Sequence, residues 1–190
     1  MKMRESKQAV RREAAGKLRQ YSEQWIMEES RKIQEYVLKS KEYMDAGTIF
    51  CYVSFGREVS TALILEDAWK AGKTVGVPLC IQKGIMEVRK IRSMDDLVPG
   101  AYGIPEPKAD TEKLDGHDIQ YGIIPCVTCD RNGNRMGHGA GYYDRYLAGT
   151  DFVKAVLCFE EILAEEVPMD AHDVRMDNMI TQSGIKKVNQ

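Results

Sequence analysis

Three glycines at alternate positions, Gly137, Gly139 and Gly141, form the segment of this sequence with the clearest capacity for chemistry. Glycine has no Cβ, so such a segment bends freely and lets backbone amides approach a ligand closely. The glycines lie between an expected strand and an expected helix start, where free N–H groups and the helix dipole favour an anion. Arg135 and Arg145 flank them and are placed to clamp phosphate oxygens. The pattern indicates a phosphate site.

The spacing of these glycines is not that of either familiar nucleotide fingerprint. A P-loop reads G-x-x-x-x-G-K-[ST] and the dinucleotide pattern reads G-x-G-x-x-G, whereas this segment reads G-x-G-x-G. On spacing alone, a flexible turn that caps a helix explains the glycines equally well. Asp144, three residues after the last of these glycines, adds a carboxylate placed to hold Mg²⁺ against the phosphates.

The cysteines suggest a reducing environment. Cys51, Cys80, Cys126, Cys129 and Cys158 are odd in number and spread through apolar segments, and no secretory signal precedes them. This usage predicts reduced thiols in a cytoplasmic protein. The single C-x-x-C pair at 126 and 129 is compatible with zinc or redox chemistry. No second pair is present and the histidines lack a zinc-finger spacing, so we favour a pair of strand-end thiols.

Composition excludes several classes of protein. The chain has 190 residues, 43% hydrophobic and 29% charged, which is ordinary globular usage for about one domain. A disordered chain, a collagen, a coiled-coil rod and a disulfide knot are excluded. The net charge of −2 argues against a broad surface for nucleic acid. No apolar run approaches the ~18 residues of a membrane span. We therefore expect a cytoplasmic monomer or weak dimer with no nucleic-acid or membrane partner.

The surrounding elements alternate between strand and helix. Residues 4–40 read as two helices that meet near 20–22, and 48–53, 58–71 and 74–77 read as a β-α-β unit, with a C-cap at Gly72 and a strand end at Pro78. Such a unit favours a parallel sheet. Further along, we expect strands at 84–91, 119–124 (ended by Pro125), 152–159 and 179–181, an extended loop at 99–107, an Asn-Gly turn within 130–135 and a helix at 142–148. The whole reads as a single α/β domain over 1–190, with an N-terminal helical segment at about 4–40.

Residues 130–145, which read D-R-N-G-N-R-M-G-H-G-A-G-Y-Y-D-R, resemble the signature of the 5-formyltetrahydrofolate cyclo-ligase family, also called methenyltetrahydrofolate synthetase. The likeness runs along nearly the whole chain. Lys7 and Arg11 occupy the basic N-terminal motif of the family, and Y-G-I-P-E-P at 102–107 and H-D-V-x-x-D at 172–177 match later motifs. The resemblance implies a three-layer, mostly parallel open sheet flanked by helices, similar to the sugar-phosphate isomerase/CoA-transferase-like fold.

The resemblance also implies an activity and a set of ligands. The family uses ATP and Mg²⁺ to close 5-formyltetrahydrofolate to 5,10-methenyltetrahydrofolate, with release of ADP and phosphate, by phosphorylation of the formyl oxygen and attack of nitrogen-10. Carried over from the family, ATP would contact Lys7, Arg11, Arg135, Met136, Gly137, His138, Gly139, Ala140, Gly141, Tyr142 and Tyr143. The folate would contact Arg11, Val53, Glu58, Tyr102, His138, Gly139, Ala140, Gly141 and Tyr142, and Mg²⁺ would be bound by Asp144 and Asp177.

Two departures from the family pattern keep other interpretations open. His138 and Ala140 stand where the family often has arginine, lysine or glycine, and a neutral imidazole predominates near pH 7. A non-catalytic folate- or nucleotide-binding module of the same fold therefore remains an alternative. A sugar-phosphate isomerase or acyl-transferase relative is another, although the sequence shows no clear base–nucleophile pair. For Lys7 and Arg11, the plain alternative is a solvated helix face. Val53 also reads as a core valine, and Tyr102 as a surface tyrosine.

Overall fold

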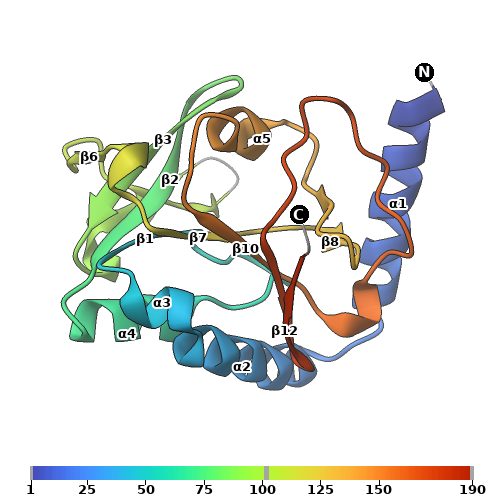
Figure 1. Ribbon diagram of the computed structural model, residues 1–190, viewed down its shortest axis with the longest axis horizontal. Coiled ribbons are helices and arrows are strands. Elements are labelled where there is room, and N and C mark those ends of the chain that lie inside the picture. The colour runs from blue at the N-terminus through green and yellow to red at the C-terminus, as the bar shows by residue number, and fades with distance from the viewer. Residues whose placement is uncertain (1, 101–102, 189–190) are drawn as a thin grey trace.

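The chain forms an eight-stranded sheet in a computed structural model that describes residues 2–100 and 103–188 (Figure 1). Strands β11, β10, β7, β1 and β2 are parallel neighbours, and β12, β3 and β6 add antiparallel edges. This confirms the predicted α/β class with a mostly parallel sheet. In spatial order the strands are β12 (Gly184–Lys187), β11 (Asn178–Thr181), β10 (Val153–Leu157), β7 (Tyr121–Ile124), β1 (Thr48–Cys51), β2 (Thr74–Gln82), β3 (Ile85–Ile91) and β6 (Lys113–Leu114).

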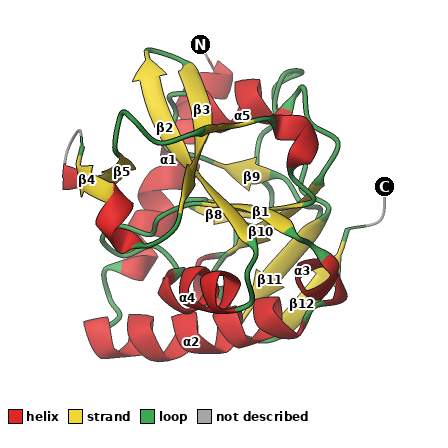
Figure 2. Cartoon of the chain, turned by 90° about the vertical axis from the view of Figure 1, so that its left-hand side faces the viewer, coloured by secondary structure: helices red, strands yellow, loops and turns green. Residues whose placement is uncertain are grey.

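Helices cover both faces of the sheet. In Figure 2, α2 (Glu23–Lys39) and α4 (Ala62–Lys70) lie together on one side, and α5 (Tyr142–Leu147) lies on the other. The short α3 (Lys41–Asp45) continues the first layer, and α1 (Lys2–Leu18) stands at one end of the sheet (Figure 1). Because both faces are covered, β1 and β7 read as continuous apolar runs, with Phe50 and Ile123 fully buried.

The predicted junction between two N-terminal helices is confirmed. The Ser22 side chain caps α2 by accepting a hydrogen bond from the Trp25 amide, 3.1 Å away. The C-cap of α4 is Ala71 rather than Gly72 as predicted, and Gly72 follows it with φ +72°. Pro125 follows β7 as predicted. Strand β12, strand β6 and helix α3 were not predicted.

Two small hairpins lie outside the main sheet. The Asn-Gly turn predicted within 130–135 joins β8 (Thr128–Cys129) to β9 (Arg135–Met136), and Gly133 at the turn has φ +77°. The extended loop predicted at 99–107 is wrong in part, because its ends pair as β4 (Leu97–Pro99) and β5 (Pro105–Pro107). Short 3₁₀ turns complete the described elements: η1 (Met94–Asp96), η3 (Gly116–Asp118) and η4 (Glu160–Ile162).

Two predicted boundaries are wrong for physical reasons. Strand β2 passes through Pro78 and ends at Gln82, because β1 pairs with β2 only as far as Gly76. Beyond that point β2 has one open edge, where proline is tolerated. Helix α4 begins at Ala62 rather than near 58, because Ser54 and Thr61 exchange side-chain-to-amide hydrogen bonds that close the preceding loop. Among the described residues, no helix is both long and apolar enough to cross a bilayer.

Candidate functional site

Two loops leave the sheet side by side, because β1 and β7 are adjacent parallel strands. Ligands of open α/β sheets bind at the carboxyl ends of the strands. The loop after β1 (residues 52–61) carries Glu58, and the segment after β7 (residues 125–141) carries the three glycines. Glu58 Oε1 lies 3.4 Å from His138 Nε2. The structure thus brings predicted site residues from two distant parts of the sequence face to face.

The glycine segment lies between β9 and α5, as the sequence predicts. Gly139 and Gly141 have φ of +101° and +70°, values that strain any residue with a side chain. Gly141 is also the N-cap of α5. His138, Gly139 and Ala140 are exposed, whereas Met136 is buried. The backbone from His138 to Ala140 is therefore available at the surface, while the residues that precede the glycines are anchored in the interior.

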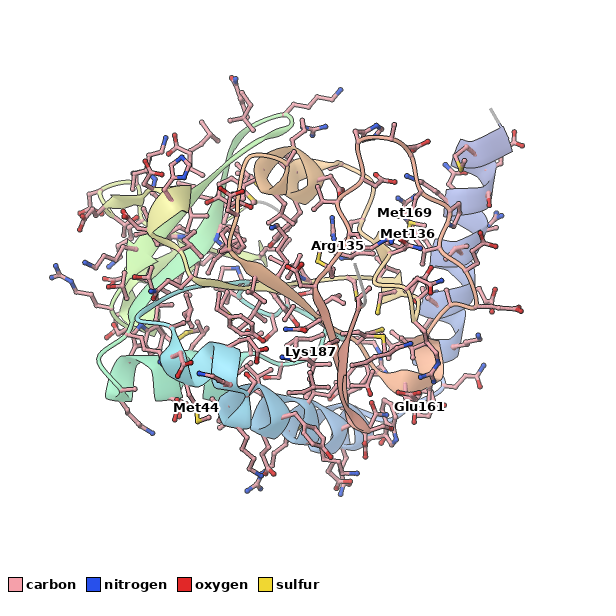
Figure 3. The ribbon with its side chains drawn as sticks, in the orientation of Figure 1. Met44, Arg135, Met136, Glu161, Met169 and Lys187 are labelled. Carbon is pink, nitrogen blue, oxygen red and sulfur yellow. The ribbon has the colours of Figure 1, made fainter. Side chains whose placement is uncertain are left out.

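Arg135 anchors the start of the glycine segment from inside the molecule. Its side chain is 2% exposed, and Nη2 donates to Asp144 Oδ1 at 2.9 Å. Nη1 donates to the Pro125 carbonyl at 3.2 Å, and the guanidinium lies over the Tyr143 ring. Figure 3 shows Arg135 and Met136 toward the middle of the molecule, on the side of α1. In this structure Arg135 holds Asp144, and its direct contact with phosphate stays a prediction.

Arg145 ties the glycine segment to a different part of the sheet. Its Nε donates to the Gly84 carbonyl at 2.7 Å, at the turn between β2 and β3. Its Nη2 donates to the Ala140 carbonyl at 2.5 Å. Both recorded partners are backbone carbonyls, so Arg145 shapes the loop. A role as the second phosphate clamp is likewise untested.

The two predicted metal ligands lie on different elements. Asp144 sits in the first turn of α5 with its side chain 15% exposed, and Oδ1 accepts from Arg135 and from the Val174 amide. Asp177 immediately precedes β11, and its Oδ2 accepts from the Lys154 amide at 2.7 Å. Both carboxylates are hard oxygen donors of the kind that Mg²⁺ selects.

Helix α1 brings its two predicted ligand contacts to this region on one face. Arg11 Nε donates to the Gly137 carbonyl at 2.7 Å, and the guanidinium also borders Gly139. One turn earlier, Lys7 Nζ lies 2.7 Å from Asp170 Oδ2 and 2.5 Å from Asp173 Oδ2. Burial alone would lower the pKa of Lys7, but the hydrogen bonds and charges of these two carboxylates raise it overall. Lys7 is therefore protonated, and it lies one helical turn from Arg11, which contacts the glycine segment.

The remaining predicted folate contacts lie on the β1 side. Val53 is half-buried against the core, and Glu58 Oε2 accepts from the Phe55 amide at 2.9 Å. Tyr142 is partly buried. Burial, and then the charge of Glu58, raise the pKa of Tyr143, so this phenol stays protonated at neutral pH. The prediction for Tyr102 lies outside the described residues.

Several residues that position the site were missed at the sequence level. Arg57 donates to the carbonyls of Leu18 and Tyr21, which fixes the loop after β1 to the end of α1. Buried Asp130 accepts from the amides of Asn132, Asn134 and Val167 and so organises the β8–β9 turn. Asp130 belongs to the motif that was recognised, but its role is visible only when its distant partner Val167 is seen.

A cavity of about 630 Å³ opens on another side of α1. Its lining includes Val10, Glu13 and Lys17 of α1 and Glu165 and Glu166 from the segment after η4. None of the predicted site residues lines it. The candidate site is therefore the surface formed by the two loops and α1, rather than this cavity.

Comparison with known proteins decides the family. The sequence model of the 5-formyltetrahydrofolate cyclo-ligase family matches residues 3–182. The chain belongs to the 5-formyltetrahydrofolate cyclo-ligase family. A cyclo-ligase of Mycolicibacterium smegmatis is 33% identical over 150 residues, which cover 70% of this chain and 73% of that protein. The cyclo-ligase of Mus musculus is 28% identical and aligns over 92% of this chain and 93% of its own length.

The cyclo-ligase fold is confirmed by solved structures. The 5,10-methenyltetrahydrofolate synthetase of Aquifex aeolicus, known from NMR, matches with a TM-score of 0.85 at 24% identity, covering 97% of this chain and 93% of that one. The synthetase of Mycoplasma pneumoniae matches with a TM-score of 0.76 at 20% identity, covering 93% of this chain and 98% of that one. At these identities the likeness supports the fold, and the predicted family is established by the sequence match.

Proposed function

We propose that this chain catalyses the ATP- and Mg²⁺-dependent closure of 5-formyltetrahydrofolate to 5,10-methenyltetrahydrofolate, with release of ADP and phosphate. The single observation that carries the proposal is the convergence of Arg11, Glu58 and Asp144 on the glycine segment, in a chain of the cyclo-ligase family. Arg11 contacts the segment itself, and Asp144 contacts Arg135, which supports the segment. The Glu58 contact joins it to the neighbouring loop.

The glycine segment and α1 supply the groups that would bind the triphosphate. The exposed backbone from His138 to Ala140 offers N–H groups, and Gly139 leaves space that a Cβ would fill against Arg11. Arg11 supplies positive charge from α1. Lys7, on the same helix face, is paired with Asp170 and Asp173, so its contact with ATP stays a prediction. Phosphoryl transfer depends mainly on such positioning and charge neutralisation.

Asp144 fits the metal that the family implies. Its hydrogen bonds from Arg135 and from the Val174 amide both end on Oδ1, and among the described residues no donor bonds to Oδ2. Buried Arg135 fixes the carboxylate in place. Mg²⁺ bound there would supply charge neutralisation for the β- and γ-phosphates. Asp177 lies immediately before β11, where it accepts from the Lys154 amide, and its role as the second carboxylate stays a prediction.

The loop after β1 would bind the pterin. Glu58 is a carboxylate that can accept hydrogen bonds from ring N–H groups. It lies 3.4 Å from His138, so the ring would replace this contact when it binds between the two loops. In the proposed reaction the formyl oxygen attacks the γ-phosphorus and ADP leaves. Nitrogen-10 then attacks the activated formyl carbon, and phosphate leaves with the oxygen while the nitrogen-10 proton passes to the departing phosphate. Arg11 and the loop amides would hold the transferring phosphoryl group against that oxygen.

A direct assay tests this proposal. Purified chain, 5-formyltetrahydrofolate, ATP and Mg²⁺ should give the ultraviolet absorbance of the methenyl product together with stoichiometric ADP. Folded chain that gives neither product would overturn the proposal. Ligand-induced thermal stabilisation without ADP release would identify the non-catalytic binding module instead.

Asp144→Asn sharpens the test of metal binding. It should lower kcat roughly 10²-fold or more, because a metal ion stabilises transition-state charge by several kcal/mol. Asp151→Asn is the matched control, since Asp151 is exposed just beyond α5, and it should keep wild-type turnover. Equal turnover in the two variants would remove Asp144 from the metal site.

A further inference from the structure

Three cysteine thiols that are far apart in the sequence meet beneath the hairpin that carries the glycine segment. The sulfurs of Cys126, Cys129 and Cys158 all lie within 4.8 Å of one another. Cys126 follows the end of β7, Cys129 lies in β8, and Cys158 directly follows β10. Cys129 and Cys158 are buried, and Cys126 is partly exposed. The proposed folate reaction uses none of them.

The chemistry of this cluster suits a soft metal ion. Thiolate sulfur binds Zn²⁺ at about 2.3 Å, which places neighbouring sulfurs roughly 3.8 Å apart around a tetrahedral ion. Sulfurs within 4.8 Å of one another need little movement to reach that spacing. The strand ends that carry Cys126 and Cys158 are themselves tied together, because Cys126 Sγ donates to the Leu157 carbonyl at 3.2 Å. The ligand set is therefore largely preformed.

Metal binding at this cluster requires loss of the thiol protons. Binding would form a metal–sulfur bond at each cysteine and release the thiol protons to solvent.

We propose that Cys126, Cys129 and Cys158 form a binding site for a thiophilic divalent cation such as Zn²⁺, separate from the carboxylate site for Mg²⁺. Soft sulfur ligands discriminate against Mg²⁺, and the carboxylates of the reaction site favour it, so the two sites select different ions. Among the described residues the cluster has three ligands, so water or a small anion completes the tetrahedron. Of the three cysteines, Cys126 is the one that is partly exposed, so it lies at the rim of the cluster.

The position of this site couples it to the reaction site. Cys129 pairs with Arg135 across the β8–β9 hairpin, and Arg135 holds Asp144. Cys126 is covalently joined to Pro125, whose carbonyl accepts from Arg135. An ion bound by the three sulfurs would therefore brace both chain segments that fix Arg135.

Zinc binding to the whole reduced chain tests the proposal. Native mass spectrometry with excess Mg²⁺ should show one Zn²⁺ per chain, and Cd²⁺ in place of Zn²⁺ should add thiolate charge-transfer absorbance. Cys158→Ser and Cys126→Ser should each weaken Zn²⁺ binding at least tenfold. Cys80→Ser is the matched control, because Cys80 is exposed and outside the cluster, and it should bind Zn²⁺ like the wild type.

Two results would overturn the proposal. One is wild-type chain that retains no Zn²⁺ under these conditions, and the other is equal retention in Cys126→Ser. The second result would point to the Asp170, His172 and Asp173 group, whose ligand atoms also lie within 4.8 Å of one another. Cys126→Ser alters only the rim position, so the test stands even if Cys158→Ser fails to fold.

Discussion

The first two helices have the same length of 17 residues and follow one another in the chain, yet they are held in different ways. Helix α2 buries Ile26, Ile33 and Val37 in the core. Among the described side chains of α1, only Ala14 is buried. Helix α1 is held instead by directed polar contacts, of which those of Lys7 and Arg11 reach the region of the glycine segment.

This difference teaches how one fold separates stability from ligand binding. Burial of apolar surface is non-directional and stabilises the fold, whereas charged contacts of partly exposed groups add little stability and fix geometry. Helix α2 also positions the site indirectly, because Ser30 and Gln34 accept from the Ser60 and Leu63 amides at the start of α4. We expect substitutions in α2 to lower stability and substitutions in α1 to weaken ligand binding.

The largest effect is expected from Ile33→Ala in α2. Ile33 is 0% exposed, and deletion of its buried side chain should lower the free energy of unfolding by about 2–5 kcal/mol. Urea denaturation measures the change. Met27→Ala on the same helix is the control, because Met27 is 70% exposed and should shift stability by about 0.5 kcal/mol or less. Similar losses in both variants would contradict the comparison.

A smaller effect, on binding rather than stability, is expected from Arg11→Ala in α1. Lost charge-assisted contacts cost about 1.5–3 kcal/mol, which corresponds to a rise in KM for ATP of roughly tenfold or more. Steady-state kinetics measure the rise. Arg12→Ala, at the exposed neighbouring position, should leave KM unchanged. An unaltered KM in Arg11→Ala would return this residue to the solvated face that the sequence also allowed.

The smallest effect is expected from pH. Burial alone would raise the pKa of Asp173, but hydrogen bonds from the Asp170 amide and from Lys7 lower it overall. A carboxyl group with a lowered pKa stabilises the fold above its unfolded pKa of about 3.9, and that stability is lost as pH falls through the folded value. Contacts between α1 and Asp173 should therefore be constant from about pH 5 to 8.

Carbon NMR of the Asp173 carboxyl group measures this titration. Its midpoint should lie below that of an unstructured aspartate and should rise in Lys7→Ala. A midpoint that Lys7→Ala leaves in place would show that Lys7 does not hold Asp173. Lys7→Arg keeps the charge and should restore part of the lowering.

The sequence predicted structural features correctly where the residues that determine them are close together in the chain. Ser22, Gly72 and the Asn-Gly turn at 132–133 each act on their own few residues, so the helix junction and the β8–β9 turn were predicted correctly and the C-cap of α4 to within one residue. The order of strand and helix also predicted the parallel sheet. The motif located the glycine segment, because its glycines and flanking charges are contiguous.

Pairings between distant segments could not be predicted. The orientation of Arg135 depends on its hydrogen bonds to Pro125 and Asp144. The continuation of β2 through Pro78 depends on where its pairing with β1 ends. The C-x-x-C pair was read as a pair of strand-end thiols, and Cys158 joins it only through the adjacency of β7 and β10, which the sequence does not show. Each of these three features depends on a contact that the tertiary structure creates.

The bond from Arg145 to the Gly84 carbonyl has a consequence for the length of the β2–β3 turn. Gly84 has φ +83°, and a Cβ there would come within 2.7 Å of the Arg145 guanidinium. Surface turns usually accept inserted residues freely. The β2–β3 turn is anchored by Arg145, so an added peptide tag or a lengthened turn would move the Gly84 carbonyl away from the guanidinium. The bond from the same guanidinium to the Ala140 carbonyl would then be weakened as well. Engineers who seek a tolerant insertion point in this enzyme should look elsewhere.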